Sequence, residues 1–168
     1  MKAKSGESGM TLMEMLTVTM ILAILVTAMG TGMEIAMQTC EVSLFHAESA
    51  MVSDILNTAL EDLLRFSRVT ETEEGYWISN GNYGISGGEI CESDGYLYLR
   101  DSGQESLLVN EGTYGALRVE DFSCSYFLDG DGSQGGFFRI CYSLTDGNRS
   151  RSVEAAVRPL NEFENKKN

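Results

Sequence analysis

The first strong pattern along the chain is a continuous apolar run near its start. From Met15 to Met33, 19 consecutive residues carry no charge. At about 1.5 Å per residue such a run reaches ~28 Å as a helix, close to the ~30 Å hydrocarbon core of a bilayer. Its threonines are compatible with an apolar helix, because each hydroxyl can bond to a carbonyl of the preceding turn. The run therefore predicts a helix long enough to cross a membrane.

Beyond Glu34 the pattern becomes amphipathic. Apolar and small residues recur at alternating spacings of four and three, which is the spacing of one helix face. They are Phe45, Ser49, Val52, Leu56, Ala59, Leu63 and Phe66, with Met51, Ile55, Leu60 and Leu64 beside them. No Gly or Pro occurs between Gly32 and Gly75. We therefore expect one helix from about Met10 to Arg68, of which the second half buries a single face.

From Gly75 onward the helical period disappears, and turn residues separate short runs as they do in antiparallel sheets. The expected strands are 76–79, 96–100, 105–109, 117–128, 137–145 and 151–158. Within 117–128 the apolar positions change parity between Val119 and Phe122, which predicts a bulge near Glu120 and Asp121. A long helix followed by strands predicts an α+β fold, in which the helix packs on a small C-terminal antiparallel sheet.

Charge argues against one class of partner and suggests an orientation. The 168 residues include 25 acidic and 12 basic side chains, a formal net charge of −13. Nucleic-acid binding needs clustered Lys and Arg, so no nucleic-acid partner is expected. At most, Arg149, Arg151 and Arg158 would form a small local patch. Lys2 and Lys4 precede the apolar run and the acidic part follows it, which predicts an N-terminus inside the cell and the remainder outside.

Three interpretations fit an apolar run in this position. A cleavable secretory signal would place its cleavage site near Ala28 to Gly30, where small residues occur. An uncleaved signal anchor would explain the length and the orientation. Neither accounts for Glu14 at the start of the run, because a charged group at the membrane centre costs about 2.5–3.5 kcal/mol.

The third interpretation depends on the register of a short motif. Residues 8–14 read Ser-Gly-Met-Thr-Leu-Met-Glu, and the apolar run follows at once. A polar leader ending in glycine, with glutamate as the fifth residue beyond it, resembles the class III signal of type IV prepilins and pseudopilins. Two departures are visible. Met10 stands where phenylalanine is commonest in that family, and Thr31, between Gly30 and Gly32, replaces the proline often found in its membrane helix.

The resemblance implies specific processing and partners. A prepilin peptidase would cleave between Gly9 and Met10, the new Met10 amine would be N-methylated, and the helix would be retained in the lipid bilayer. Glu14 would act in assembly with other pilin or pseudopilin subunits on an inner-membrane platform. Physical chemistry agrees, because the new amine would lie one helical turn before Glu14 and could neutralise it in the same or a neighbouring chain. A carboxylate in the first turn also complements the helix dipole.

The expected organisation follows from these patterns. A leader occupies 1–9, a transmembrane and assembly helix 10–37, its amphipathic continuation 38–72, a sheet domain 73–160 and a polar tail 161–168. Gly30 and Gly32 predict either a bend or unwound stretch, or a site of close helix packing.

The expected protein is a minor pilin-like or pseudopilin subunit of a type IV filament-type machine for type II secretion, competence or a pilus. It would be a single-pass cytoplasmic-membrane protein assembled into a filament, with its C-terminal domain outside. The alternative is a signal-anchored extracytoplasmic binding domain that acts without polymerising.

Other candidate sites have weaker sequence support. The segment 129–136 alternates oxygen ligands, but it lacks the Gly and Glu of an EF-hand loop, so a flexible hairpin connection is favoured over calcium binding. Matching of apolar faces places Cys124 and Cys141 on opposite faces, which disfavours a bridge between them; pairing with Cys91 and buried free thiols both stay open. His46 is expected on the helix surface. No catalytic motif is present, so we expect no enzymatic activity, cofactor or metal.

Overall fold

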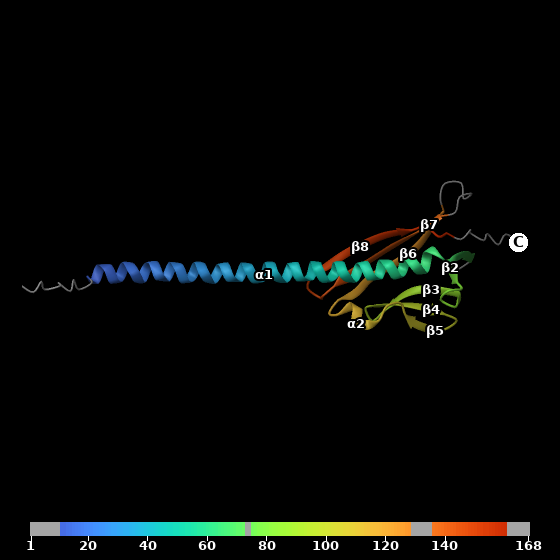
Figure 1. The fold of residues 1–168 in the computed structure, drawn as a ribbon, viewed down its shortest axis with the longest axis horizontal. Helices are drawn as coiled ribbons and strands as arrows, with labels where there is room; N and C mark the ends of the chain where they lie inside the picture. Colours follow the sequence, from blue (N-terminus) through green and yellow to red (C-terminus); the bar gives the residue numbers. More distant parts are fainter. Residues whose placement is uncertain (1–10, 73–74, 129–135, 161–168) are drawn as a thin grey trace, which may run out of the picture. The chain divides into compact units, whose positions relative to one another are not determined.

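The computed structural model describes residues 11–72, 75–128 and 136–160 (Figure 1). By its internal contacts the chain divides into two compact units, residues 1–44 and 45–168, which are described separately. Helix α1 (Leu12–Arg65) contributes its first part to one unit and its second part to the other.

The first unit is the N-terminal part of α1. Every residue from Thr11 to Leu44 is exposed. The threonine hydroxyls donate back into the helix, as from Thr17 to the Met13 carbonyl at 2.8 Å, which removes free donors from the apolar surface. The helix continues without interruption through Gly30 and Gly32, so the expected unwound stretch is absent there. Their use in close packing against another helix stays a prediction.

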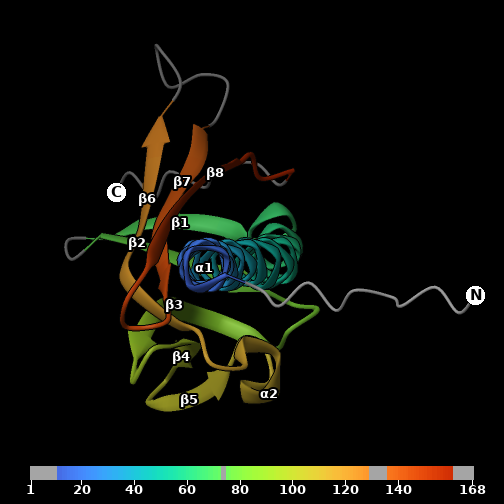
Figure 2. The same cartoon turned by 90° about the vertical axis from the view of Figure 1, so that its left-hand side faces the viewer.

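In the second unit, the remainder of α1 supplies the centre of the core. Its buried residues are Phe45, Ser49, Val52, Ser53, Leu56, Leu60, Leu63 and Leu64. The buried face is wider than expected because strands of two sheets lie around the helix (Figure 2). Two expected positions were wrong: Met51, placed beside this face, is 67% exposed, and Phe66, beyond the end of the helix, is 46% exposed. Ala59 is partly buried.

Two antiparallel sheets complete the second unit. The first is a meander in which β1 (Arg68–Thr72), β2 (Gly75–Asn80), β3 (Ile85–Ser93), β4 (Tyr96–Asp101) and β5 (Gln104–Leu107) pair in chain order. A short helix, α2 (Glu111–Tyr114), leads to the second sheet. That sheet contains β6 (Arg118–Leu128), β7 (Gly136–Thr145) and β8 (Ser150–Val157), again in chain order. The expected α+β fold, a long helix packed on antiparallel sheet, is confirmed.

The helix ends earlier than expected, and two strands had been missed. We expected helix to about Arg68 and an amphipathic continuation to residue 72, but α1 ends at Arg65 and β1 begins at Arg68. The Leu160 amide donates to the Arg65 carbonyl at 2.7 Å, satisfying one of the free carbonyls at the helix end. Strand β3 was missed because its two glycines look like turn residues. At Gly87 an added Cβ would lie 2.7 Å from the Trp77 ring, so the strand needs glycine for close packing.

The bulge expected in β6 is present. Pairing of β6 with β7 shifts register between Glu120 and Ser123, and Asp121 adopts a left-handed φ of 56°. The extra residue brings Phe122 and Tyr126 to the inner face of the strand, where Val119 already lies.

Polar contacts fix α1 to both sheets. The Tyr142 hydroxyl of β7 donates to Asn57 Oδ1 at 3.0 Å, and Arg151 Nη1 of β8 donates to Ser49 Oγ at 3.4 Å. From the first sheet, Asn80 Nδ2 donates to the Leu63 carbonyl at 2.8 Å. Each sheet is therefore attached to the helix by directional bonds as well as by apolar packing.

Candidate functional site

The start of α1 holds the first candidate site. Thr11 precedes the helix, and Glu14 lies in its first turn. Glu14 Oε2 accepts hydrogen bonds from the Thr11 amide at 2.8 Å and from the Thr11 hydroxyl at 3.1 Å. The Glu14 amide donates to Thr11 Oγ1 at 3.3 Å. These reciprocal bonds form a capping box, which satisfies donors that the first helical turn leaves free.

The capping box gives Glu14 a partner that we had not assigned to it. The expected role of Glu14 did not include Thr11. The signal was present, since Thr-Leu-Met-Glu before an apolar run is the sequence pattern of a capping box. Gly9 and Met10, the residues of the expected cleavage site, lie outside the described residues.

An exposed apolar surface follows directly on the capping box. Large side chains including Leu16, Ile21, Leu25 and Met29 are each more than half exposed. Within the described ranges, α1 is the one helix long and apolar enough to cross a membrane. Its most apolar stretch of 18 residues is not buried. By length and composition this N-terminal helix could serve as a membrane anchor.

The cysteines carry no disulfide. Cys40 is exposed, Cys91, Cys124 and Cys141 are partly buried, and all four are free thiols. In the second sheet Ser123 pairs with Cys141 and Cys124 pairs with Ile140, so the two cysteines are offset by one residue and face opposite sides. The expectation against a Cys124–Cys141 bridge is therefore confirmed.

A hollow of about 480 Å³ opens between β3 and β6. Leu64, Ile78, Tyr126 and Phe138 contribute to its walls, together with the thiol of Cys124. Burial raises the pKa of Cys124 to about 12, so this thiol stays protonated at neutral pH and is a poor nucleophile. The lining combines polar and apolar groups, so the hollow is not a purely apolar pocket.

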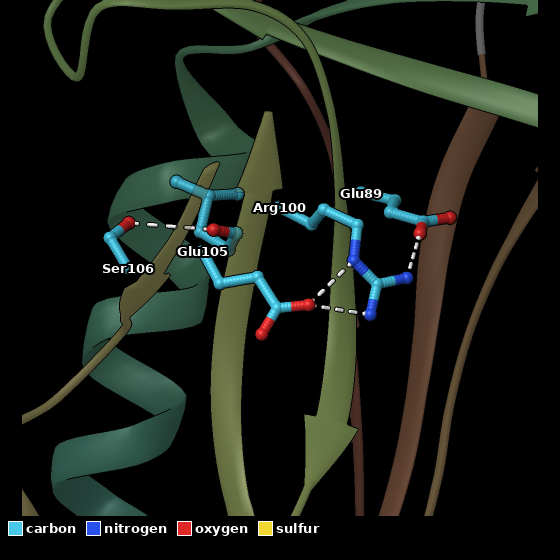
Figure 3. A network of polar contacts seen from close by, with 5 residues as sticks. Glu89, Arg100, Glu105 and Ser106 are labelled. Carbon is cyan, nitrogen blue, oxygen red and sulfur yellow. Dashed lines mark hydrogen bonds and ion pairs between the residues drawn. The ribbon is translucent and has the colours of Figure 1, made fainter. Parts of the chain in front are cut away.

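Charged residues on the first sheet form a surface network across three strands (Figure 3). Arg100 of β4 pairs through Nη1 with Glu89 of β3 at 2.8 Å and through Nη2 with Glu105 of β5 at 2.7 Å. The hydrogen bonds that Arg100 donates, first to Glu105 and then to Glu89, raise the pKa of Arg100. Because these side chains are largely exposed, the network helps to set strand register and does not form an enclosed site.

The remaining expected sites do not form a reaction centre. His46 is exposed on α1, as expected, with its ring edge-on to Phe45. Arg149 and Arg158 lie at opposite ends of β8, about 30 Å apart for an extended strand, so the expected basic patch was wrong. The possible calcium loop lies outside the described residues, except for Gly136. Among the described residues, no group of three or more His, Cys, Asp or Glu could hold a metal ion.

Comparison with known proteins adds no assignment: no family model, curated protein or solved structure matches the chain.

Proposed function

We propose that this chain is a minor pilin-like or pseudopilin subunit of a type IV filament-type machine, serving type II secretion, competence or a pilus. The observation that carries the proposal is a single carboxylate, Glu14, held in the first turn of an exposed apolar helix and in register with Gly9. The fold, a long N-terminal helix with antiparallel sheet packed on its second part, is consistent with a pilin-like subunit.

In this proposal, processing creates a positively charged amine that can neutralise the Glu14 carboxylate. Cleavage between Gly9 and Met10 by a prepilin peptidase releases a new amine, four residues before Glu14 and thus about one helical turn away. The amine is then N-methylated and retains its positive charge. Glu14 can exchange its bonds to Thr11 for this amine, in its own chain or in a neighbouring subunit, and the paired charges cost less in lipid than an isolated carboxylate.

The exposed apolar side chains of α1 are the surface through which subunits would pack in the bilayer and in the filament. The sheet domain would remain outside the cytoplasmic membrane, and other subunits and an inner-membrane platform would be the partners. No role in catalysis is assigned to the chain, and neither a cofactor nor nucleic acid is part of the proposal.

The hollow between β3 and β6 favours one alternative, a signal-anchored extracytoplasmic binding domain that does not polymerise. The mature N-terminus separates the two functions. Mass spectrometry of the protein recovered from membranes should show a chain that begins at methylated Met10. A chain that retains Met1 would refute the filament proposal and favour the anchored domain, and a start near Thr31 would indicate a released, secreted domain.

A further inference from the structure

The turn between β7 and β8 carries a motif that the proposed filament function does not use. Residues 146–150 read Asp-Gly-Asn-Arg-Ser. Asn148, Arg149 and Ser150 match the Asn-x-Ser acceptor of N-linked glycosylation, in which x is any residue except proline. This is the one such triplet in the sequence. Asp146 adds a carboxylate two positions before the asparagine.

The structure presents the acceptor side chain to solvent. Asn148 lies in the bend between the two strands and is exposed, as are Asp146 and Gly147. Ser150, the hydroxyl residue of the motif, is exposed at the first position of β8. Within the described ranges the Asn148 carboxamide has no hydrogen-bond partner, so its nitrogen is accessible to a transferase.

Local hydrogen bonds also hold the turn. Asp146 Oδ1 accepts from the Asn148 amide at 2.8 Å and from the Arg149 amide at 2.7 Å. Thr145 Oγ1 accepts from the Gly147 amide at 3.0 Å, and Gly147 adopts a φ of 90° that favours glycine. These bonds place Asn148 at the apex of the hairpin. The apex of the hairpin is therefore open to an enzyme from the solvent side.

We propose that Asn148 is an acceptor site for an N-linked saccharide. The donor is a saccharide joined through its anomeric carbon to a polyprenyl diphosphate. The Asn148 side-chain nitrogen forms a bond to that carbon and loses one proton, while the bond from the carbon to the diphosphate oxygen breaks and polyprenyl diphosphate leaves. No group is oxidised or reduced. In the cell the modification rests on the proposed function, because the orientation proposed there places the hairpin on the extracytoplasmic side, where this donor is used.

The first test is independent of orientation. The purified full chain in detergent is incubated with a bacterial single-subunit oligosaccharyltransferase and a polyprenyl-diphosphate saccharide, and peptides are analysed by mass spectrometry. The expected result is the mass of one saccharide on Asn148. Asn148→Gln and Ser150→Ala should abolish transfer, and Ser150→Thr should retain it. Ser152→Ala, a matched change of an exposed serine on the same strand, should leave transfer unchanged.

The second test uses cells that produce the same transferase and donor, converted to spheroplasts before protease treatment so that external protease reaches the outer face of the cytoplasmic membrane. Modification of Asn148 together with external protease access to the sheet domain would support both the proposed orientation and the proposed acceptor site. Transfer in detergent but not in cells, with the domain protected from external protease, would refute the proposed orientation alone. If the domain is accessible but unmodified in cells, glycosylation in the cell is refuted. If the purified chain is not modified while a control acceptor peptide is, the acceptor site itself is refuted.

Discussion

Replacement of Asn80 tests whether the end of α1 is fixed by a buried amide donor. Asn80 is 1% exposed, and its Nδ2 donates to the Leu63 carbonyl at 2.8 Å and to Ser67 Oγ at 3.4 Å. Its Oδ1 accepts from the Asn82 amide at 3.0 Å. Asn80→Ala removes these bonds and should lower the free energy of unfolding by about 1–3 kcal/mol, the usual cost of leaving buried partners unsatisfied.

At neutral pH, Asn80→Asp should lower the free energy of unfolding by more than Asn80→Ala does. The carboxylate cannot donate to the Leu63 carbonyl, and a buried charge without a cation costs about 3–5 kcal/mol. Burial raises the pKa of such a carboxyl in the folded state above its unfolded value of about 3.9. The folded state then binds the proton more tightly, so stability is retained below the unfolded pKa and is lost as pH rises through the folded pKa.

The assay is urea unfolding of the full chain in detergent, followed by the fluorescence of Trp77, the one tryptophan, which lies on the same strand as Asn80. At pH 7.5 the Asp variant should be about 2 kcal/mol less stable than the Ala variant. Near pH 4 this gap should narrow, because the protonated carboxyl can donate to Leu63. Equal stability of the two variants at both pH values would refute the assignment of a buried donor.

Three further predictions concern the helix, a thiol and the turn. Glu14→Ala should leave the protein in the membrane fraction but remove it from sheared filaments, whereas Glu34→Ala should not; equal recovery of both would contradict the role of Glu14. Cys124 should react with iodoacetamide at pH 7.5 about 100-fold more slowly than exposed Cys40, and at a similar rate in urea, because its pKa is raised to about 12. Backbone hydrogen bonds from Arg149 and Asn148 lower the pKa of Asp146, so the turn should lose amide protection in hydrogen exchange only as pH falls below about 4; protection unchanged at pH 2 would contradict this.

Elements with a regular apolar period could be predicted from the sequence, because burial of one face imposes that period. The second part of α1 and strands β6, β7 and β8 are of this kind, and the parity change in β6 even located its bulge. Strand β1 was missed because its residues, Arg-Val-Thr-Glu-Thr, are mostly polar. Strand β3 was missed because it contains Gly87 and Gly88. A side chain at these positions would collide with the Trp77 ring and the Arg100 carbonyl, and no local sequence pattern reveals such contacts between strands.

The candidate site was predictable only in part. Glu14 was conspicuous because a charge beside an apolar run is rare. Its partner, Thr11, was overlooked because a threonine before a helix has many uses, although Thr-Leu-Met-Glu matches the capping-box pattern that the reciprocal bonds then form. The prediction of a basic patch from Arg149, Arg151 and Arg158 was wrong for a simpler reason. Residues close in the sequence become distant when the strand between them is extended.

The polar contacts between α1 and the two sheets have a mechanical consequence. They reach the helix at Ser49, Asn57 and Leu63, and so span about 21 Å of its length. A pull along the helix axis would load all three in shear at the same time and would not peel them apart one after another. The helix should therefore resist displacement up to a single threshold force and then yield in one step.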